Sequence, residues 1–156
     1  MAVESKTKIL PGKKVAEFLE GIIHSGTQIH DRCVDLTAKQ VYILEGPGSL
    51  DFGGSELEIG KRRKYPKVKR SREDKYGWWN LGGGQYVVEY NEKLKLPEDK
   101  AAILYPRAEL LGNEVIHPTI MIEGEEELPA MCLSVGAPGI HIKENARISR
   151  LVVLDL

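Results

Sequence analysis

The residues that stand out first for possible ligand chemistry form a basic segment in the middle of the chain. Seven of the ten residues from Lys61 to Arg70 are lysine or arginine, and a tryptophan pair follows at positions 78 and 79. Basic side chains beside aromatic rings can bind phosphates or single-stranded nucleic acid. No amphipathic period organises the segment, and Glu73 and Asp74 interrupt its charge. The sequence therefore favours a solvated loop over residues 61–76, with a phosphate-facing role as the alternative, and does not favour nucleic acid as a partner.

Signatures of other catalytic chemistries are absent from the sequence. Zinc deaminases need a cysteine pair and a His-x-Glu, whereas the stretch from Pro129 to Cys132 holds a single cysteine. There is no Walker loop, and the four histidines have no metal-ligand spacing, so we expect no zinc. Cys33 and Cys132 form no C-x-x-C pair, which indicates two buried thiols in a reducing cytoplasm.

Length and composition place the chain among globular proteins of one domain. It has 156 residues, a formal net charge of -1 and a hydrophobic content of 42%. No apolar run approaches the roughly 20 residues of a membrane span, and the N-terminus has no apolar signal core. We therefore expect a cytoplasmic protein of a single domain over 1–156 that does not bind membranes.

The hydrophobic pattern predicts one helix followed by many short strands. Val15, Phe18, Leu19, Ile22 and Ile23 fall on one face of a helix over about 12–24. Extended segments rich in β-branched and aromatic residues follow, separated by glycine and proline turns. This pattern is typical of a sandwich or barrel. The strands are predicted at 33–36, 41–44, 86–90, 101–105, 116–122, 131–135, 139–142 and 147–154.

Three short motifs in a fixed order carry a family resemblance over most of the chain. They are the Val-Asp-Leu at 34–36, the Leu-Pro-Glu-Asp at 96–99 that leads into a Pro-Arg turn, and the Ala-Arg-Ile at 146–148. In this order they resemble the dCTP deaminase and dUTPase superfamily. The resemblance implies a distorted jelly-roll or β-barrel, a homotrimer, and sites formed between neighbouring subunits.

The same resemblance assigns candidate roles around the Pro-Arg turn. Arg107 matches an arginine that grips the phosphates of a deoxynucleoside triphosphate, and Asp35, the aspartate of the first motif, is a second substrate-binding candidate. Ala108 and Glu109 stand where the family has two serines. A carboxylate at 109 would repel a triphosphate unless Mg²⁺ lay between them, so Glu109 is either a catalytic residue or a surface residue.

A second part of the family site corresponds to the acidic stretch after residue 122. Gly124 matches a substrate-binding glycine, and Glu123 could replace a catalytic aspartate with a shift of one residue. The alternative is a solvated acidic hairpin. Cys132 stands where deaminases carry a proton-shuttling glutamate, a task a thiol performs poorly.

The resemblance leaves two functions open. One is an enzyme that deaminates dCTP or hydrolyses Mg²⁺-bound dUTP to dUMP and pyrophosphate. The other is a divergent relative with degenerate motifs and a nucleotide-binding, regulatory or structural role. Family members continue into a closing arm, whereas this sequence ends at Leu156, so we expect that arm to be missing.

Overall fold

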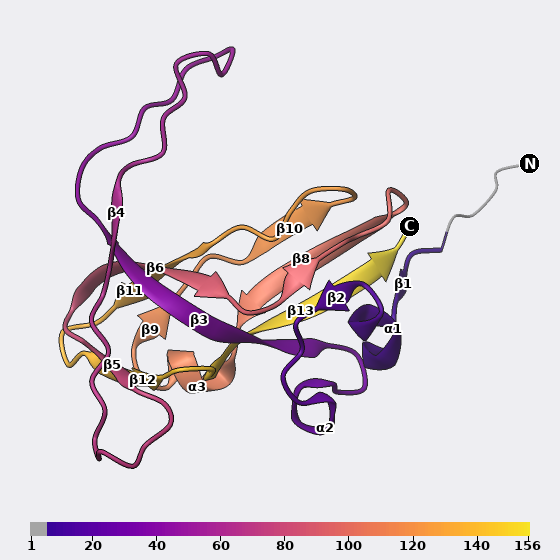
Figure 1. The fold of residues 1–156 in the computed structure, drawn as a ribbon. Coiled ribbons are helices and arrows are strands. Elements are labelled where there is room, and N and C mark those ends of the chain that lie inside the picture. Colours follow the sequence, from indigo (N-terminus) through magenta and orange to yellow (C-terminus); the bar gives the residue numbers. More distant parts are fainter. Residues whose placement is uncertain (1–5) are drawn as a thin grey trace, which may run out of the picture.

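Antiparallel strands make up most of the computed structural model, which describes residues 6–156 (Figure 1). Three short helices accompany them: α1 (Gly12–Ala16), α2 (Ser25–Gln28) and α3 (Ala108–Leu111). The strands are β1 (Lys8–Ile9), β2 (Leu19–Glu20), β3 (Val34–Leu44), β4 (Arg62–Lys64), β5 (Trp78–Leu81), β6 (Gly84–Tyr90), β7 (Lys93–Leu94), β8 (Lys100–Pro106), β9 (Val115–Ile116), β10 (Ile120–Glu123), β11 (Met131–Val135), β12 (Ile140–Lys143) and β13 (Arg147–Asp155).

One curled sheet organises the molecule. Its strand order is β10-β8-β13-β3-β6-β11-β9, with β1 paired to β13 and β4 paired to β3. There are also two separate two-stranded sheets, β12-β5 and β2-β7. The sheet wraps around a core whose largest fully buried side chains include Trp79, Leu36, Leu104 and Leu133. The prediction of a mainly β, barrel-like fold is confirmed.

All eight predicted segments coincide with strands, but their bounds differ at two junctions, and β1, β2, β4, β5 and β7 were not predicted. β3 runs without a break from residue 34 to 44, although two strands were predicted there. The predicted strand over 116–122 is divided into β9 and β10, which pair with different partners, β11 and β8. Pro118 lies between them and cannot donate a ladder hydrogen bond.

The predicted N-terminal helix over about 12–24 is wrong in its extent. Helix α1 ends at Ala16, and the chain turns into β2, where Leu19 pairs with Leu94. Gly21 has a φ of 91°, which no helix accommodates. The apolar spacing thus comes from one helical turn followed by a strand, both facing the core. None of the helices described over residues 6–156 is long and apolar enough to cross a membrane.

The connection between β3 and β4 forms an arm that projects from the body (Figure 1). Only a few backbone hydrogen bonds join its two sides, including the pair between Ser49 and Glu58. Phe52 and Leu50 near its tip are 110% and 89% exposed, and Ile59 is 71% exposed. The arm therefore holds apolar side chains that the chain itself does not cover.

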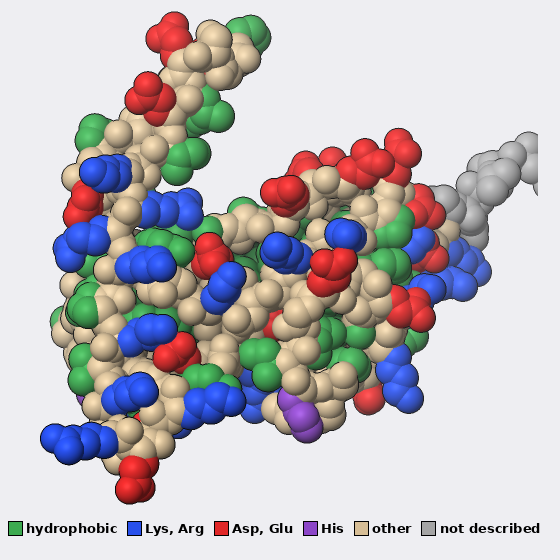
Figure 2. Space-filling view, in the orientation of Figure 1, with side chains coloured by type: hydrophobic (Ala, Val, Ile, Leu, Met, Phe, Trp, Pro, Cys, Tyr) green, Lys and Arg blue, Asp and Glu red, His purple; other side chains and the backbone are tan. Residues whose placement is uncertain are grey.

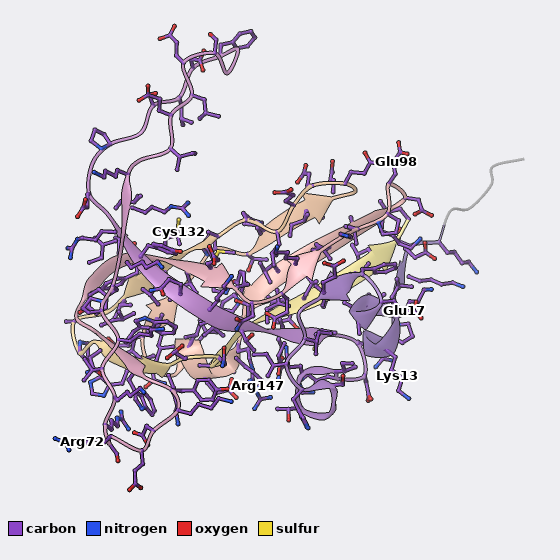
Figure 3. The ribbon with its side chains drawn as sticks, in the orientation of Figure 1. Lys13, Glu17, Arg72, Glu98, Cys132 and Arg147 are labelled. Atoms are coloured by element: carbon purple, nitrogen blue, oxygen red, sulfur yellow. The ribbon has the colours of Figure 1, made fainter. Side chains whose placement is uncertain are left out.

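The basic segment is exposed, as predicted, but it is only partly a loop. Residues 62–64 form β4, which pairs with Tyr42–Leu44 at the end of β3. The prediction of two buried cysteines is correct only for Cys33. Cys132 is exposed, because it lies on the outward face of β11, and both cysteines are unpaired (Figure 3).

We expect Gly12→Ala to destabilise the fold by about 1–3 kcal/mol, because the added methyl group overpacks a closed contact. A Cβ atom on Gly12 would lie 1.8 Å from the carbonyl oxygen of His30. Gly46→Ala is the matched control, since its Cβ would meet nothing within 4 Å. Urea unfolding of the two variants checks this, and equal midpoints would contradict it.

Candidate functional site

A buried carboxylate surrounded by three arginines and a histidine is the centre of the site. Asp35 is 0% exposed. Its oxygens lie 2.7 Å from His30 Nε2, 2.9 Å from Arg147 Nη1, 3.3 Å from Arg150 Nε and 3.5 Å from Arg107 Nη1. A buried charge is tolerated only when it is paired and hydrogen-bonded. Both Asp35 oxygens are engaged in this way, so the carboxylate acts as an anchor for the basic side chains around it.

Strand register brings these side chains together from three parts of the chain. β13 lies between β3 and β8, and Arg150 is directly opposite Asp35 on one side and Tyr105 on the other. Arg107 follows the end of β8, where it caps α3 and donates its backbone N–H to Ile148. The substrate-binding candidates Asp35 and Arg107 are therefore neighbours.

A β-bulge in β13 recruits two arginines that the sequence analysis did not assign to the site. The pairing with β3 shifts between Arg147 and Ser149, so Ile148 is the extra residue. Ile148 and Ser149 are both buried, at 1% and 0% exposure. In a regular strand, residues 147 and 150 would face opposite sides of the sheet. The bulge places Arg147 and Arg150 on the same face of the sheet. This placement is visible only from the strand pairing.

Arg107 has unused hydrogen-bonding capacity although it is 7% exposed. Its Nη2 donates to Glu109 Oε1 at 3.0 Å, while its buried Nε has no partner among the described residues. Three guanidinium groups thus meet one buried carboxylate and the exposed Glu109. The excess positive charge and the free N–H favour an anion such as a phosphate.

A hollow of about 470 Å³ opens beside this cluster. Its lining includes His30 and Arg150 together with Ile29, Asp31, Arg32 and Cys33. Burial raises the pKa of the Cys33 thiol, which outweighs the nearby Arg150, so a thiolate nucleophile is not favoured here. Burial opposes the charge on Arg150, but Asp35 holds the Arg150 pKa above its ordinary value.

A chain of buried hydroxyl and imidazole groups supports β13 from the core side. Tyr90 OH lies 2.6 Å from Ser149 Oγ, and His117 Nε2 lies 2.8 Å from the same oxygen. His117 Nδ1 is 2.9 Å from the Pro118 carbonyl oxygen, so Nδ1 carries the proton and Nε2 accepts. Burial lowers the pKa of His117, which fits this neutral form.

A second buried network fixes the chain around Asp35. Gln28 Nε2 donates to the Asp35 carbonyl oxygen at 2.9 Å and to Glu92 Oε2 at 3.1 Å. Glu92 also accepts the Thr37 N–H and hydroxyl, at 2.7 and 2.6 Å. Burial raises the pKa of Glu92 against these donors. Helix α2 and β3 are thereby tied together where the site begins.

The structure does not bring Glu123 and Gly124 to this cluster within one chain. Glu123 pairs with Ala101 at the start of β8, whereas Arg107 follows its end, about 20 Å away at 3.3 Å per residue. Gly124 packs against Pro97 and Glu98, where a Cβ would lie 2.5 Å from backbone atoms. Figure 3 shows Glu98 and Arg147 near opposite ends of the paired strands β8 and β13. A second hollow of about 810 Å³ lies beside this hairpin, lined by residues 89–97 and 125–130 and by Lys39.

The described residues of one chain include no ready-made metal centre. Within residues 6–156, no group of three or more His, Cys, Asp or Glu side chains could hold an ion. The Asp35 carboxylate already pairs with arginine side chains and is not free for a metal ion. The Glu109 side chain, by contrast, is 67% exposed. Mg²⁺ commonly binds through one or two carboxylates together with substrate phosphates. Glu109 is the carboxylate beside Arg107 that fits this arrangement.

Comparison with known proteins places the chain in a family. It is 34% identical over 140 residues to a probable deoxyuridine 5′-triphosphate nucleotidohydrolase of Methanosarcina mazei, covering 88% of this chain and 78% of that protein. The chain belongs to the dCTP deaminase and dUTPase superfamily. The Methanocaldococcus jannaschii deoxyuridine 5′-triphosphate nucleotidohydrolase is 30% identical over 129 residues, 82% of this chain and 79% of that one. No protein-family model matches the chain.

A solved structure confirms the superfamily fold. The 2′-deoxycytidine 5′-triphosphate deaminase of Agrobacterium tumefaciens matches with a TM-score of 0.67 at 16% identity. The match covers 96% of this chain and 47% of that one, so this chain spans about half of the deaminase. At this identity the likeness concerns the fold alone.

We expect Asp35→Asn to destabilise the protein by about 3–5 kcal/mol, because the buried arginines lose the carboxylate that compensates them. Glu109→Gln is the control, and its exposed side chain should change the free energy of unfolding by about 1 kcal/mol or less. Denaturant unfolding at pH 7.5 measures both. A mild effect of the Asp35 substitution would show that Asp35 is not the anchor.

The lowered pKa of His117 predicts a loss of stability in acid. Above its unfolded-state pKa of about 6.5 the group is neutral in both states; below it, the unfolded chain takes up a proton that the folded state resists. Stability should therefore fall as pH drops from 7.5 to 5. His117→Gln should reduce this slope in urea unfolding, and an unchanged slope would contradict the assignment.

Proposed function

We propose that this protein hydrolyses dUTP to dUMP and pyrophosphate. The observation that carries the proposal is the Asp35-anchored arginine cluster, in which Arg107 keeps a free, buried N–H. A polyphosphate is the deoxynucleotide part that such a cluster fits best. The curated relatives with similar sequences, named deoxyuridine 5′-triphosphate nucleotidohydrolases, supply the substrate class.

The arginine cluster would act by neutralising the triphosphate and fixing its position. Arg107, Arg147 and Arg150 would donate to phosphate oxygens, and Asp35 would hold their guanidinium groups in place. Water attacks the α-phosphorus, forming a new P–O bond while the bond to the α–β bridging oxygen breaks. Pyrophosphate leaves with that oxygen. Asp35 is an unsuitable base for this water, since its oxygens already contact His30, Arg147 and Arg150 at hydrogen-bond distance and pair with Arg107.

Glu123 is our candidate for the base, and this requires a second copy of the chain. Its carboxylate is exposed, and it lies about 20 Å from Arg107 along β8 of the same chain. We therefore propose that the site forms between copies of a homotrimer, with the Glu123–Gly124 hairpin of one copy beside Arg107 of its neighbour. The uncovered apolar side chains of the arm, among them Leu50 and Phe52, support an assembled form.

Mg²⁺ belongs to this proposal as a companion of the triphosphate. When bound, the ion would offset phosphate charge and polarise the reacting phosphoryl group. Glu109, beside Arg107, is the side chain that would share it with the substrate. With the ion in place, a carboxylate at this position no longer opposes substrate binding.

Deamination of dCTP is less well supported by the residues present. Cys132, which stands at the position of the deaminase glutamate, is an exposed thiol. No carboxylate replaces it at that position. The fold likeness to a dCTP deaminase applies equally to both activities, so it does not favour deamination.

Incubation of the protein with dUTP and Mg²⁺ should give dUMP and pyrophosphate, separated by ion exchange. Arg107→Ala should lower kcat/KM by about 100-fold or more, because a buried charge-assisted donor to the phosphates is lost. Arg72→Ala is the control, since Arg72 is exposed and far from the cluster (Figure 3). Conversion of dCTP to dUTP instead would establish the deaminase activity and sink the proposal.

Mixing two inactive variants tests whether the site is shared between copies. Arg107→Ala and Glu123→Gln should each be nearly inactive alone. After subunit exchange, a mixture should regain a fraction of the wild-type rate, because some sites again combine both native residues. Absence of any recovery in a mixture shown to exchange would place both residues in the same copy.

A further inference from the structure

The basic segment 61–75 concentrates charge that the rest of the chain lacks. It holds nine of the 22 lysines and arginines and two of the 23 acidic residues, so its formal charge is +7 in a chain of net charge -1. We call these nine side chains the basic strip: Lys61, Arg62, Arg63, Lys64, Lys67, Lys69, Arg70, Arg72 and Lys75. The separation of charge between this strip and the remaining chain gives the molecule one strongly positive face.

The strip is exposed and mostly unpaired. Figure 2 shows lysine and arginine side chains following one edge of the molecule, from the root of the arm past β4. Arg63 pairs with Glu45 at 2.6 Å and Lys67 with Glu144 at 3.1 Å. Within the described part of the chain, the other seven members have no carboxylate within salt-bridge distance. The strip thus retains most of its charge for a partner.

Contacts with β5 hold the strip in a defined place. The Arg70 guanidinium lies 3.5 Å from the centre of the Trp78 ring, and Lys143 Nζ lies 5.6 Å from it. Val68 and Trp78 exchange backbone hydrogen bonds of 2.9 and 2.8 Å. Tyr65 OH donates to the Asn80 carbonyl oxygen at 2.8 Å. A charged segment fixed in this way loses less conformational entropy when it binds.

The composition of the strip favours a polyanion over a protein partner. Protein interfaces have an apolar centre from which lysine is depleted, whereas Val68 is the one large apolar side chain exposed among residues 61–75. Interfaces with nucleic acid are much more positively charged. The Arg70 stack occupies the Trp78 ring, which leaves phosphate contacts rather than base stacking as the means of recognition.

We propose that the basic strip binds the phosphate backbone of a nucleic acid without regard to base sequence. The strip is separate from the arginine cluster: Arg62 to Lys64 pair with Leu44 to Tyr42, about 23 Å along β3 from Asp35. The inference does not depend on the proposed activity, since no residue of the strip belongs to the site of dUTP hydrolysis.

Fluorescence anisotropy of a labelled 20-nucleotide single strand and of its duplex tests the proposal. Native protein should bind at 50 mM salt, with an affinity that falls steeply as salt rises. A Lys61→Gln, Arg62→Gln, Lys64→Gln variant should bind at least about tenfold more weakly, with a log–log salt slope smaller by about two for the single strand. The control is Lys6→Gln, Lys8→Gln, Lys13→Gln, which removes the same charge from exposed positions near the N-terminus.

Three results would overturn the proposal. The first is no binding at low salt with protein at about 100 µM, the weak end of non-specific affinity. The second is equal weakening by the strip and control variants, which would indicate net charge alone. The third is a change in assembled mass of the strip variant with unchanged oligonucleotide binding, which would make the strip a contact between copies. Arg107→Ala should bind the oligonucleotide normally, which separates this surface from the nucleotide site.

Discussion

The burial of one carboxylate among three arginines and a histidine is the constraint on which the site depends. If most of these side chains were removed, Asp35 would become an isolated buried charge. In turn, it fixes three guanidinium groups that would otherwise repel each other. The local structure of β3, β8 and β13 follows from this requirement, because those strands must meet in one register for the charges to be compensated.

Buried polar networks on either side make this register rigid. The Tyr90–Ser149–His117 chain holds the core face of β13, and the Gln28–Glu92–Thr37 network holds the start of β3. Such networks are stabilising only when every member is satisfied, which makes them sensitive to displacement. By fixing β3 and β13 in the core, they also fix the arginines at the surface where a phosphate would bind.

The single chain places Arg107 and Glu123, the phosphate anchor and the base of the proposed function, at opposite ends of β8. A paired β-strand has a fixed length, so Glu123 and Arg107 of one chain stay apart at the two ends of β8. Assembly of several copies is the route that we propose for joining them, and the arm has apolar side chains that one copy leaves in water. The basic strip lies at yet another place on the surface, so catalytic and polyanion-binding roles can coexist in one subunit.

The sequence by itself determined the mainly β class and the positions of the eight predicted strand segments, because alternating apolar residues and turn residues act locally. That Asp35 and Arg107 belong to one site was implied by the family resemblance, and the structure shows them as an ion pair. The sequence pattern failed on helix 12–24, where one helical turn and a strand share the spacing of a longer helix. Only the tertiary structure revealed the roles of His30, Arg147 and Arg150, and the separation of Glu123 from Arg107. A bulge changes which face a residue occupies, and strand register sets distances between residues far apart in sequence. Neither property is encoded in any local stretch of the chain.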